Sequence, residues 1–206
     1  MDRNATDNNI ILLGGFHEVI ELCEKAGFNI IGIIDSVLEN NYLGYPILGT
    51  DNDAENLYSK YGNCKLVVSP DSPIVRERLV RLYKRIGWEF ATIISPSSRI
   101  SKSAIIGVGS IIQDGVNVSA FTKIGNYVKL NTNANIMHDN NIGDFVTVAP
   151  NAVSLGRITI GMSSYIGANA TILPDVIIGH RSVIGAGSVV TKRVLDNTIV
   201  KGVPAK

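Results

Sequence analysis

The chain has 206 residues, of which 45% are hydrophobic, and a formal net charge of +1 at neutral pH. This near-neutral balance gives no electrostatic reason to expect nucleic acid or an anionic membrane as a partner, and no apolar run reaches the roughly 18 residues that span a bilayer. The polar first residues carry no signal-peptide pattern. The two cysteines, Cys23 and Cys64, lack metal-ligand spacing. We therefore expect a cytoplasmic protein with reduced thiols and no membrane insertion.

The first part of the sequence alternates strand-like and helix-like segments. Three short apolar runs predict buried strands, at residues 9–13, 28–35 and 64–69. Residues 17–27 carry apolar side chains at helical spacing and end at a glycine. Residues 73–87 predict an amphipathic helix with a basic outer face. This order is typical of a small parallel α/β, Rossmann-like domain, which we assign to residues 1–93.

From Ile94 the sequence has a period of six. Every sixth residue from Ile94 to Val190 is aliphatic with one exception, and the residue four places further on is Ser, Ala, Val or Thr with two exceptions. The three departures are Asn140, Ser154 and Ile158. Such a period predicts a parallel β-helix in which each hexad forms one short strand and three hexads complete a coil, so that residue n stacks on residue n+18. We assign residues 94–206 to this β-helix and a C-terminal tail.

The departures from the period fall in two hexads that are eighteen residues apart and should stack. The first of these hexads also holds His138 and Asp139, and stacking places Gly156 one coil above His138. A glycine N–H beside a histidine is a geometry that an acyl-transfer site needs. Clustered irregularity in an otherwise regular array favours function. The alternative is that His138 and Asp139 decorate a solvated turn.

The array as a whole resembles a known family. Its hexads, the terminal GVPAK and the segments IGIID, YPILGTD and TIISPSSRIS are similar to those of left-handed β-helix acyltransferases, in particular the sialic acid O-acetyltransferases and bacillosamine-pathway N-acetyltransferases. The resemblance extends over nearly the whole chain. It implies acetyl transfer from acetyl-CoA to an amino or hydroxyl group of a sugar, without a metal. It also implies a homotrimer with active sites between subunits.

The same resemblance implies roles for individual residues. His138 would be the general base of a direct transfer, Asp139 would orient its ring, and the Gly156 N–H would stabilise the oxyanion. Coenzyme A would lie between adjacent β-helices and contact Thr147, Gly156, Ala168, Ala186, Lys201, Gly202, Val203, Pro204 and Ala205. The α/β domain would hold a nucleotide-sugar through Gly14, Gly15, His17 and Asp35.

Three positions differ from the family pattern. The turn at Gly14 and Gly15 is shorter than in the family, and its N–H groups either hold a phosphate or only close the turn. Thr147 and Ser95 stand where relatives often have histidine. These differences bear on the contacts with acetyl-CoA and the acceptor and leave the His138–Asp139 pair untouched.

Other functions remain open at the level of sequence. O-acetylation of a sialic-acid-type hydroxyl competes with N-acetylation of a nucleotide-linked amino sugar, and the residues do not separate an amine from a hydroxyl acceptor. Metal-dependent hydration, as in β-helix carbonic anhydrases, needs three histidine ligands, whereas the β-helix has two histidines on different faces. A non-catalytic scaffold that has lost its substrate site is the third possibility.

Overall fold

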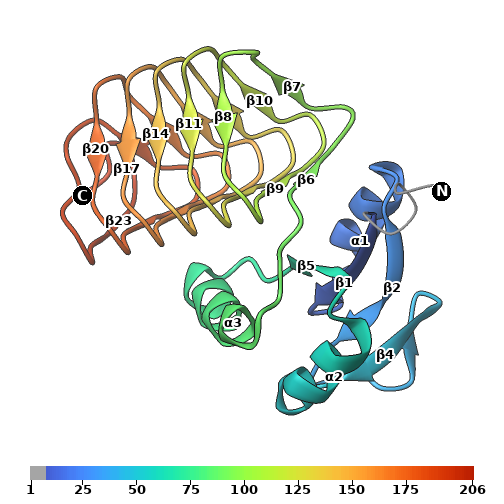
Figure 1. Cartoon of the computed structure of the whole chain (residues 1–206). Helices are drawn as coiled ribbons and strands as arrows, with labels where there is room; N and C mark the ends of the chain where they lie inside the picture. Colours follow the sequence, from blue (N-terminus) through green and yellow to red (C-terminus); the bar gives the residue numbers. More distant parts are fainter. Residues whose placement is uncertain (1–7) are drawn as a thin grey trace.

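The computed structural model describes residues 8–206, so the first seven residues of the predicted N-terminal domain lie outside the described part. An α/β unit comes first along the chain, and a prism of stacked coils follows it (Figure 1). The α/β unit contains β1 (Asn9–Leu13), α1 (His17–Lys25), β2 (Asn29–Ile34), β3 (Asn41–Tyr42), β4 (Tyr45–Gly49), a 3-10 turn (Asp51–Asp53), α2 (Ala54–Tyr61), β5 (Lys65–Val68) and α3 (Pro73–Ile86). No helix within residues 8–206 is long and apolar enough to cross a membrane.

The α/β unit is built on a five-stranded sheet with the order β3-β4-β2-β1-β5. The three predicted strands are confirmed as β1, β2 and β5, and the two predicted helices as α1 and α3. Strand β1 pairs in parallel with β2 on one side and β5 on the other. After β1 the chain therefore adds β2, β4 and β3 on one side of β1, and later adds β5 on the other side. The carboxyl ends of β1 and β5 consequently flank a topological switch point, where open α/β sheets leave a crevice.

The prism has three faces, which we number. Face 1 contains β7 (Arg99–Ile100), β10 (Asn117–Val118), β13 (Asn135–Ile136), β16 (Val153–Ser154), β19 (Thr171–Ile172) and β22 (Val189–Val190). Face 2 contains β8 (Ile105–Ile106), β11 (Lys123–Ile124), β14 (Asn141–Ile142), β17 (Thr159–Ile160) and β20 (Ile177–Ile178). Face 3 contains β6 (Ile93–Ile94), β9 (Ile111–Ile112), β12 (Lys129–Leu130), β15 (Thr147–Val148), β18 (Tyr165–Ile166), β21 (Val183–Ile184) and β23 (Ile199–Val200).

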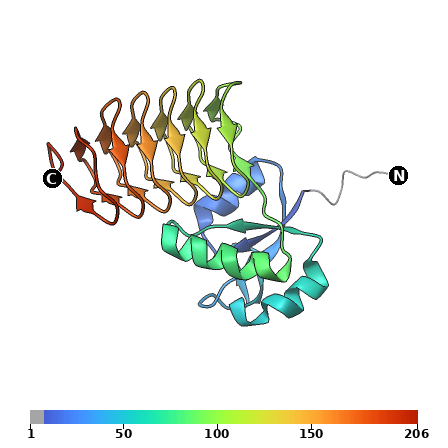
Figure 2. The same ribbon diagram turned by 60° about the vertical axis from the view of Figure 1, so that its left-hand side comes forward.

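The hexapeptide period is confirmed without interruption, and the domain is a left-handed β-helix (Figure 2). Paired residues are eighteen apart, as in the pairs Asn135↔Val153 and Ile136↔Ser154. The inward aliphatic side chains form one buried core along the prism. Glycines that follow them allow adjacent coils to approach, because a Cβ on Gly107 would come within 2.4 Å of the Gly125 backbone. Close stacking is therefore encoded in the hexads that carry this glycine.

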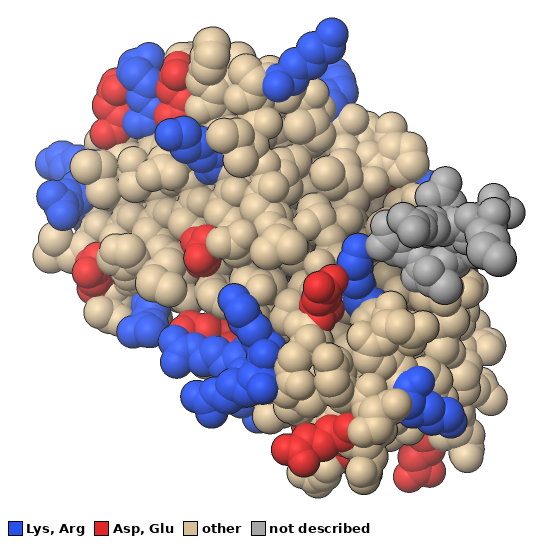
Figure 3. Space-filling view, viewed as in Figure 1, with Lys and Arg blue, Asp and Glu red and all other residues tan. Residues whose placement is uncertain are grey.

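The α/β unit packs on face 3 and on the corner between faces 2 and 3. Two aromatic residues at that corner, Tyr127 and Phe145, are buried and stack with their ring centroids 5.0 Å apart. Both belong to the hydrophobic cluster that fills the space around α3. The solvent side of α3 is basic, as predicted, and its lysine and arginine side chains gather in the lower middle of Figure 3. Faces 1 and 2 and the corner between them are left uncovered by the α/β unit.

Candidate active site

The corner between faces 1 and 2 carries the predicted pair. His138 and Asp139 follow β13, and both side chains are about half exposed, at 47% and 51%. Asp139 adopts a left-handed conformation with φ of 58°, which aspartate tolerates better than most residues. Its Oδ2 lies 2.8 Å from His138 Nδ1. When Nδ1–H donates to this carboxylate, the lone pair of the neutral ring is on Nε2.

Gly156 lies directly against the imidazole, as the eighteen-residue stacking predicts. A Cβ added at Gly156 would be 2.6 Å from His138 Cε1 and 2.7 Å from Nε2. The ring therefore occupies the space that a side chain would take. Within the described residues the Gly156 N–H makes no hydrogen bond, whereas its carbonyl accepts one from Asp175 N. A free amide donor and a histidine nitrogen thus lie side by side.

The three departures from the period form one buried network behind this pair. The Asn140 side chain is inside the prism and 1% exposed. Its Nδ2 donates to the carbonyls of Met137 (2.7 Å) and Leu155 (2.8 Å). Its Oδ1 accepts from the Ser154 hydroxyl (3.1 Å) and from the Ile158 N–H (3.0 Å). One buried amide therefore explains why Ser154 replaces an aliphatic residue.

The coil above the pair carries an ion pair. Arg157 stacks above Asp139 and donates two hydrogen bonds to Asp175, of 2.7 and 2.9 Å. These bonds raise the pKa of the Arg157 guanidinium and lower the pKa of the Asp175 carboxyl. Because Arg157 forms its hydrogen bonds with Asp175, the Asp139 carboxylate is available to pair with His138.

The residues predicted to contact coenzyme A do not all gather at this corner. Ala168 and Ala186 lie at the corner between faces 3 and 1, where the Gly187 N–H donates to the Ala168 carbonyl (2.8 Å). The C-terminal tail, Lys201 to Ala205, folds onto the same corner through bonds from Gly202 N to Ser188 Oγ (3.0 Å) and from Ala205 N to the Val189 carbonyl (2.8 Å). These residues form a second cluster, separate from His138 within one chain.

Thr147 lies elsewhere again, and its position does not support the predicted cofactor contact. Its side chain is fully buried beneath α3. The hydroxyl donates to the Asp71 carbonyl (2.7 Å) and accepts from Arg76 Nη2 (2.9 Å). The physical reason is that the α/β unit covers this stretch of face 3, which the hexad pattern alone does not reveal. Thr147 is a contact between the two parts of the chain.

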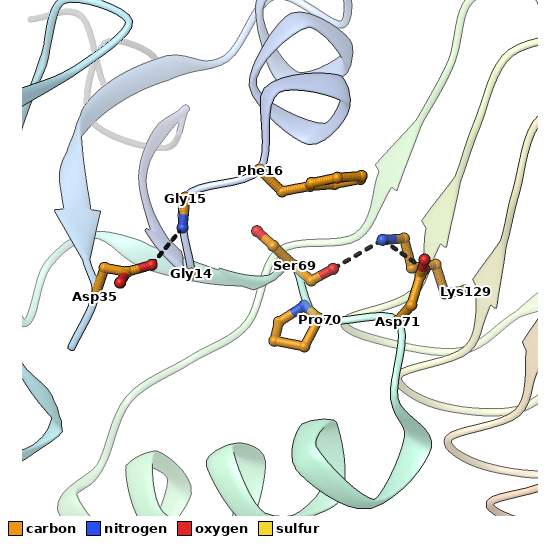
Figure 4. A pocket seen from close by; sticks show the side chains of 8 residues that line it. All are labelled: Gly14, Gly15, Phe16, Asp35, Ser69, Pro70, Asp71 and Lys129. Atoms are coloured by element: carbon orange, nitrogen blue, oxygen red, sulfur yellow. Dashed lines mark hydrogen bonds and ion pairs between the residues drawn. The ribbon is translucent and has the colours of Figure 1, made fainter. Parts of the chain in front are cut away.

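A pocket of about 170 Å³ opens at the switch point of the α/β sheet (Figure 4). Three of the four residues predicted to bind the acceptor line it, namely Gly14, Gly15 and Asp35. The remaining lining residues are Phe16, Ser69, Pro70, Asp71 and Lys129. His17, the fourth predicted residue, is exposed outside this lining, with its ring 5.0 Å from the Phe16 ring. The pocket thus combines the ends of β1, β2 and β5 with one residue of the β-helix.

The shortened glycine turn is closed by a carboxylate. Gly15 N donates to Asp35 Oδ2 at 2.9 Å, and the N–H groups of Val37 and Leu38 donate to Oδ1. Burial alone would raise the pKa of Asp35, but these three backbone donors outweigh it and hold the pKa below its usual value. The Gly15 N–H is therefore occupied, and of the two alternatives for this turn the geometry favours closure over phosphate binding by that group.

Lys129 is the main functional candidate that sequence reasoning missed. Its ammonium is buried, donates to the Ser69 carbonyl (2.8 Å) and pairs with Asp71 (2.9 Å). It also lies 5.0 Å from the centre of the Phe16 ring. Burial lowers the pKa of Lys129, and the Asp71 carboxylate partly offsets this effect. Within the described part of the chain the buried Ser69 hydroxyl has no hydrogen-bond partner, so an unpaired hydroxyl and a cation lie next to each other in the wall of the pocket.

The chain folds as a hexapeptide-repeat β-helix, and comparison with known proteins places it among the acyltransferases of this fold. Residues 157–192 match the family of bacterial transferase hexapeptides (six repeats). A search of curated proteins found no sequence match. Among solved structures, WeeI from Acinetobacter baumannii AYE is 33% identical over 96% of this chain and 98% of that chain, with a TM-score of 0.85.

Two further structures carry informative ligands. Perosamine N-acetyltransferase from Caulobacter crescentus, in a histidine-to-asparagine variant bound to CoA and GDP-perosamine, is 28% identical with a TM-score of 0.92, over 96% of this chain and 95% of that chain. The acetyltransferase domain of PglB from Neisseria gonorrhoeae, in complex with acetyl coenzyme A, is 28% identical with a TM-score of 0.91, over 97% and 98%. The chain belongs to the hexapeptide-repeat acetyltransferase family of sialic acid O-acetyltransferases and bacillosamine-pathway N-acetyltransferases.

Proposed function

We propose that this protein transfers an acetyl group from acetyl-CoA to the amino group of a nucleotide-linked amino sugar. The observation that carries the proposal is the His138 ring, which is bonded to Asp139 through Nδ1 and packed on Gly156. The ligands of two similar structures, GDP-perosamine with CoA and acetyl coenzyme A, support the same substrates here. Both of these relatives are acetyltransferases, and the one bound to a nucleotide-sugar is an N-acetyltransferase, which favours an amine over a hydroxyl acceptor.

The geometry supports direct transfer with His138 as general base. Nε2 takes a proton from the acceptor amine as its nitrogen attacks the thioester carbonyl. The C–N bond forms, the C–S bond breaks, and coenzyme A leaves as a thiol that receives the proton. Asp139 keeps the ring in the required tautomer and stabilises the imidazolium. The Gly156 N–H donates to the oxyanion, a contribution of about 3 kcal/mol.

Neither cysteine is placed to form a covalent acyl-enzyme. The two cysteines, Cys23 and Cys64, are buried in the α/β unit. Burial raises the pKa of Cys23 to about 12 and raises the pKa of Cys64, so neither supplies a thiolate near neutral pH.

The pocket at the switch point is the proposed site for the nucleotide part of the acceptor. Ligands of open α/β sheets bind beyond the carboxyl ends of the strands, and an acidic residue after the second strand commonly bonds the ribose hydroxyls. Asp35 holds that place, directly after β2. The unpartnered Ser69 hydroxyl and the Lys129 ammonium lie in the same pocket.

We further propose that the active site forms between subunits of a homotrimer. Lys129 links the pocket to face 3, whereas His138 lies at the corner between faces 1 and 2, which is opposite face 3 in a triangular prism. The proposed coenzyme A cluster at Ala168 and Ala186 occupies yet another corner. Within one chain the switch-point pocket, the His138 corner and the proposed coenzyme A cluster lie too far around the prism to act on the same acetyl group. A neighbouring subunit can bring its own copy of one of these sites next to the others.

Turnover of His138 and Asp139 variants tests the proposed chemistry. We expect His138→Ala to lower kcat by about 10²–10⁴-fold, the usual contribution of a positioned base, with little change in affinity for coenzyme A. Asp139→Asn should cost less, because an amide still orients the ring but does not stabilise its charge. Release of coenzyme A with a panel of nucleotide-linked amino sugars is the measurement. Normal turnover by a folded His138→Ala protein would reduce the pair to turn decoration.

A further inference from the structure

The buried amide of Asn140 contacts the two peptide groups that frame the proposed site. Its Nδ2 donates to the carbonyl of Leu155, which shares a peptide plane with the N–H of Gly156. It also donates to the carbonyl of Met137, which shares a peptide plane with the N–H of His138. In a trans peptide the carbonyl and the N–H point in opposite directions. A carbonyl held toward the inside of the prism therefore directs the Gly156 N–H outward, beside the His138 ring.

The same corner of the first coil closes without a bridging side chain. Three coils earlier, at the position equivalent to Leu155 and Ile158, the Ala104 N–H donates directly to the Ser101 carbonyl (3.0 Å). In the coil of Gly156 the Asn140 amide bridges the two equivalent groups. Its Oδ1 accepts from the Ile158 N–H (3.0 Å), and its Nδ2 donates to the Leu155 carbonyl (2.8 Å). Asn140 thus bridges the two groups through its amide and sets the tilt of the Leu155–Gly156 peptide.

The regular coils also show what a simpler side chain achieves at this position. Ser164 occupies the equivalent place at the next corner, and its hydroxyl donates to the carbonyl of Gly179 (2.7 Å), fifteen residues on. Leu155 is likewise fifteen residues after Asn140, so a hydroxyl at position 140 can reach the same carbonyl. An alanine or valine cannot, although both occur at this position in other hexads.

We propose that Asn140 is a positioning residue for the acetyl transfer: its amide fixes the Leu155–Gly156 peptide so that the Gly156 N–H faces the acetyl oxygen beside the histidine. The Met137 carbonyl is held by Asn140 together with the Thr122 hydroxyl, which also donates to it (2.7 Å). This role rests on the proposed function, because it requires Gly156 to be the oxyanion donor. Asn140 itself is 1% exposed and makes no contact with substrate. Asn140 is expected to affect only the stability of the transition state, because it acts by orienting the Gly156 N–H.

The test compares Asn140→Ala, Asn140→Val and Asn140→Ser with Ser164→Ala in the full-length protein. Ser164→Ala removes the same kind of buried hydrogen bond at a corner that carries no catalytic pair. We expect Asn140→Ala and Asn140→Val to lower kcat about tenfold or more, below the 10²–10³-fold cost of losing an oxyanion donor outright. The KM values for acetyl-CoA and acceptor should stay within about twofold, because ground-state binding does not use this peptide tilt.

Asn140→Ser should recover most of the kcat, because its hydroxyl anchors the Leu155 carbonyl. Ser164→Ala should keep a nearly normal kcat even if its melting temperature falls as far as that of Asn140→Ala. Equal kcat losses in Asn140→Ala and Ser164→Ala, or no recovery by serine despite a restored melting temperature, would overturn the positioning role. If instead His138→Ala retains full turnover, the proposed function itself fails, so the two failures are distinguishable. Since Ala, Val and Ser all occupy this place in other hexads, these variants are expected to fold.

Discussion

At the scale of single residues, the proposed site depends on residue 156 being a glycine. The His138 imidazole rests where a Cβ of residue 156 would be. A glycine in this place does two things at once, because it makes room for the ring and leaves its own N–H uncovered beside it. The left-handed conformation of Asp139 is shared by the other corners of the prism, so it is a property of the fold and carries no special strain.

Gly156→Ala should therefore disable the site through the histidine. We expect the new methyl to push the ring away from both the oxyanion donor and Asp139, and kcat to fall by about 10²-fold, in the range of a misplaced base. The β-helix should fold normally, because this position faces outward. The measurement is a double-mutant cycle with His138→Ala. Additive losses in the double variant would show that Gly156 acts independently of the ring.

Residue-level prediction succeeded where the period fixes the register. The stacking of Gly156 on His138 follows from their separation of eighteen, which the strand pairing confirms. It failed at Lys129 and Thr147, which look like ordinary outward positions in their hexads. Their burial comes from the α/β unit that covers face 3, and no periodicity in the β-helix encodes a neighbour outside it.

At the scale of elements, a buried arginine of α3 makes most of the hydrogen bonds by which this helix contacts the β-helix. Arg76 donates to the backbone carbonyls of Pro70, Asp71, Tyr127, Phe145 and Val146 and to the Thr147 hydroxyl, at 2.7 to 3.1 Å. Burial lowers its pKa to about 10, and Asp71 partly offsets the shift. The guanidinium remains charged at neutral pH, so its cost of burial is met by bonds to carbonyl oxygens on both sides of the interface.

Removing this arginine should destabilise the protein far more than removing an exposed one from the same helix. We expect Arg76→Met to lower the free energy of unfolding by on the order of 3–5 kcal/mol, because several buried carbonyls lose their donors. The matched control is Arg78→Met, whose side chain is 71% exposed and lies 3.9 Å from Asp51. That change should cost less than about 1 kcal/mol. Urea denaturation at one protein concentration measures both, and equal losses would contradict the structural role of Arg76.

The elements themselves were predictable because their patterns are local. The strands at residues 9–13, 28–35 and 64–69, the two helices and every hexad were confirmed. The short strands β3 and β4 and the helix α2 were missed. The basic face of α3 was predicted as its outer face, yet Arg76 points inward against the β-helix. A sequence shows that a helix has two faces, but the partner of each face depends on tertiary docking.

At the scale of the whole molecule, the proposed functional places are distributed around the prism. The pocket lies on the side of face 3, the His138 pair on the opposite corner, and the C-terminal tail on a third position. A monomer would hold them apart, and light scattering at micromolar concentration should therefore show a trimer.

Mixed trimers test whether a site uses two subunits. Deleting residues 201–206 should raise the KM for acetyl-CoA, because the tail forms part of the proposed coenzyme cluster, and His138→Ala should lower kcat by about 10²–10⁴-fold. At a low acetyl-CoA concentration both variants should turn over slowly, and co-assembly of the two at equal amounts should raise the rate above that of either alone. A site that takes its histidine and its tail from different subunits is intact in about a quarter of cases for random mixing. No recovery in verified hybrids would mean that each site belongs to a single chain.

The position of His138 along the prism also has a consequence for its dynamics. Stacked coils contact only their immediate neighbours, so their unfolding starts at the ends and spreads inward, as in other one-dimensional repeats. Strands β13 and β16, which carry His138 and Gly156, are the two central strands of the six on face 1. Fraying at either end must therefore cross two strands of this face before it separates the histidine from the glycine. The proposed catalytic pairing is expected to be among the last contacts of the β-helix to open, and the hydrogen-bonded amides of Met137 and Leu155 beside it are expected to be among the slowest to exchange with solvent.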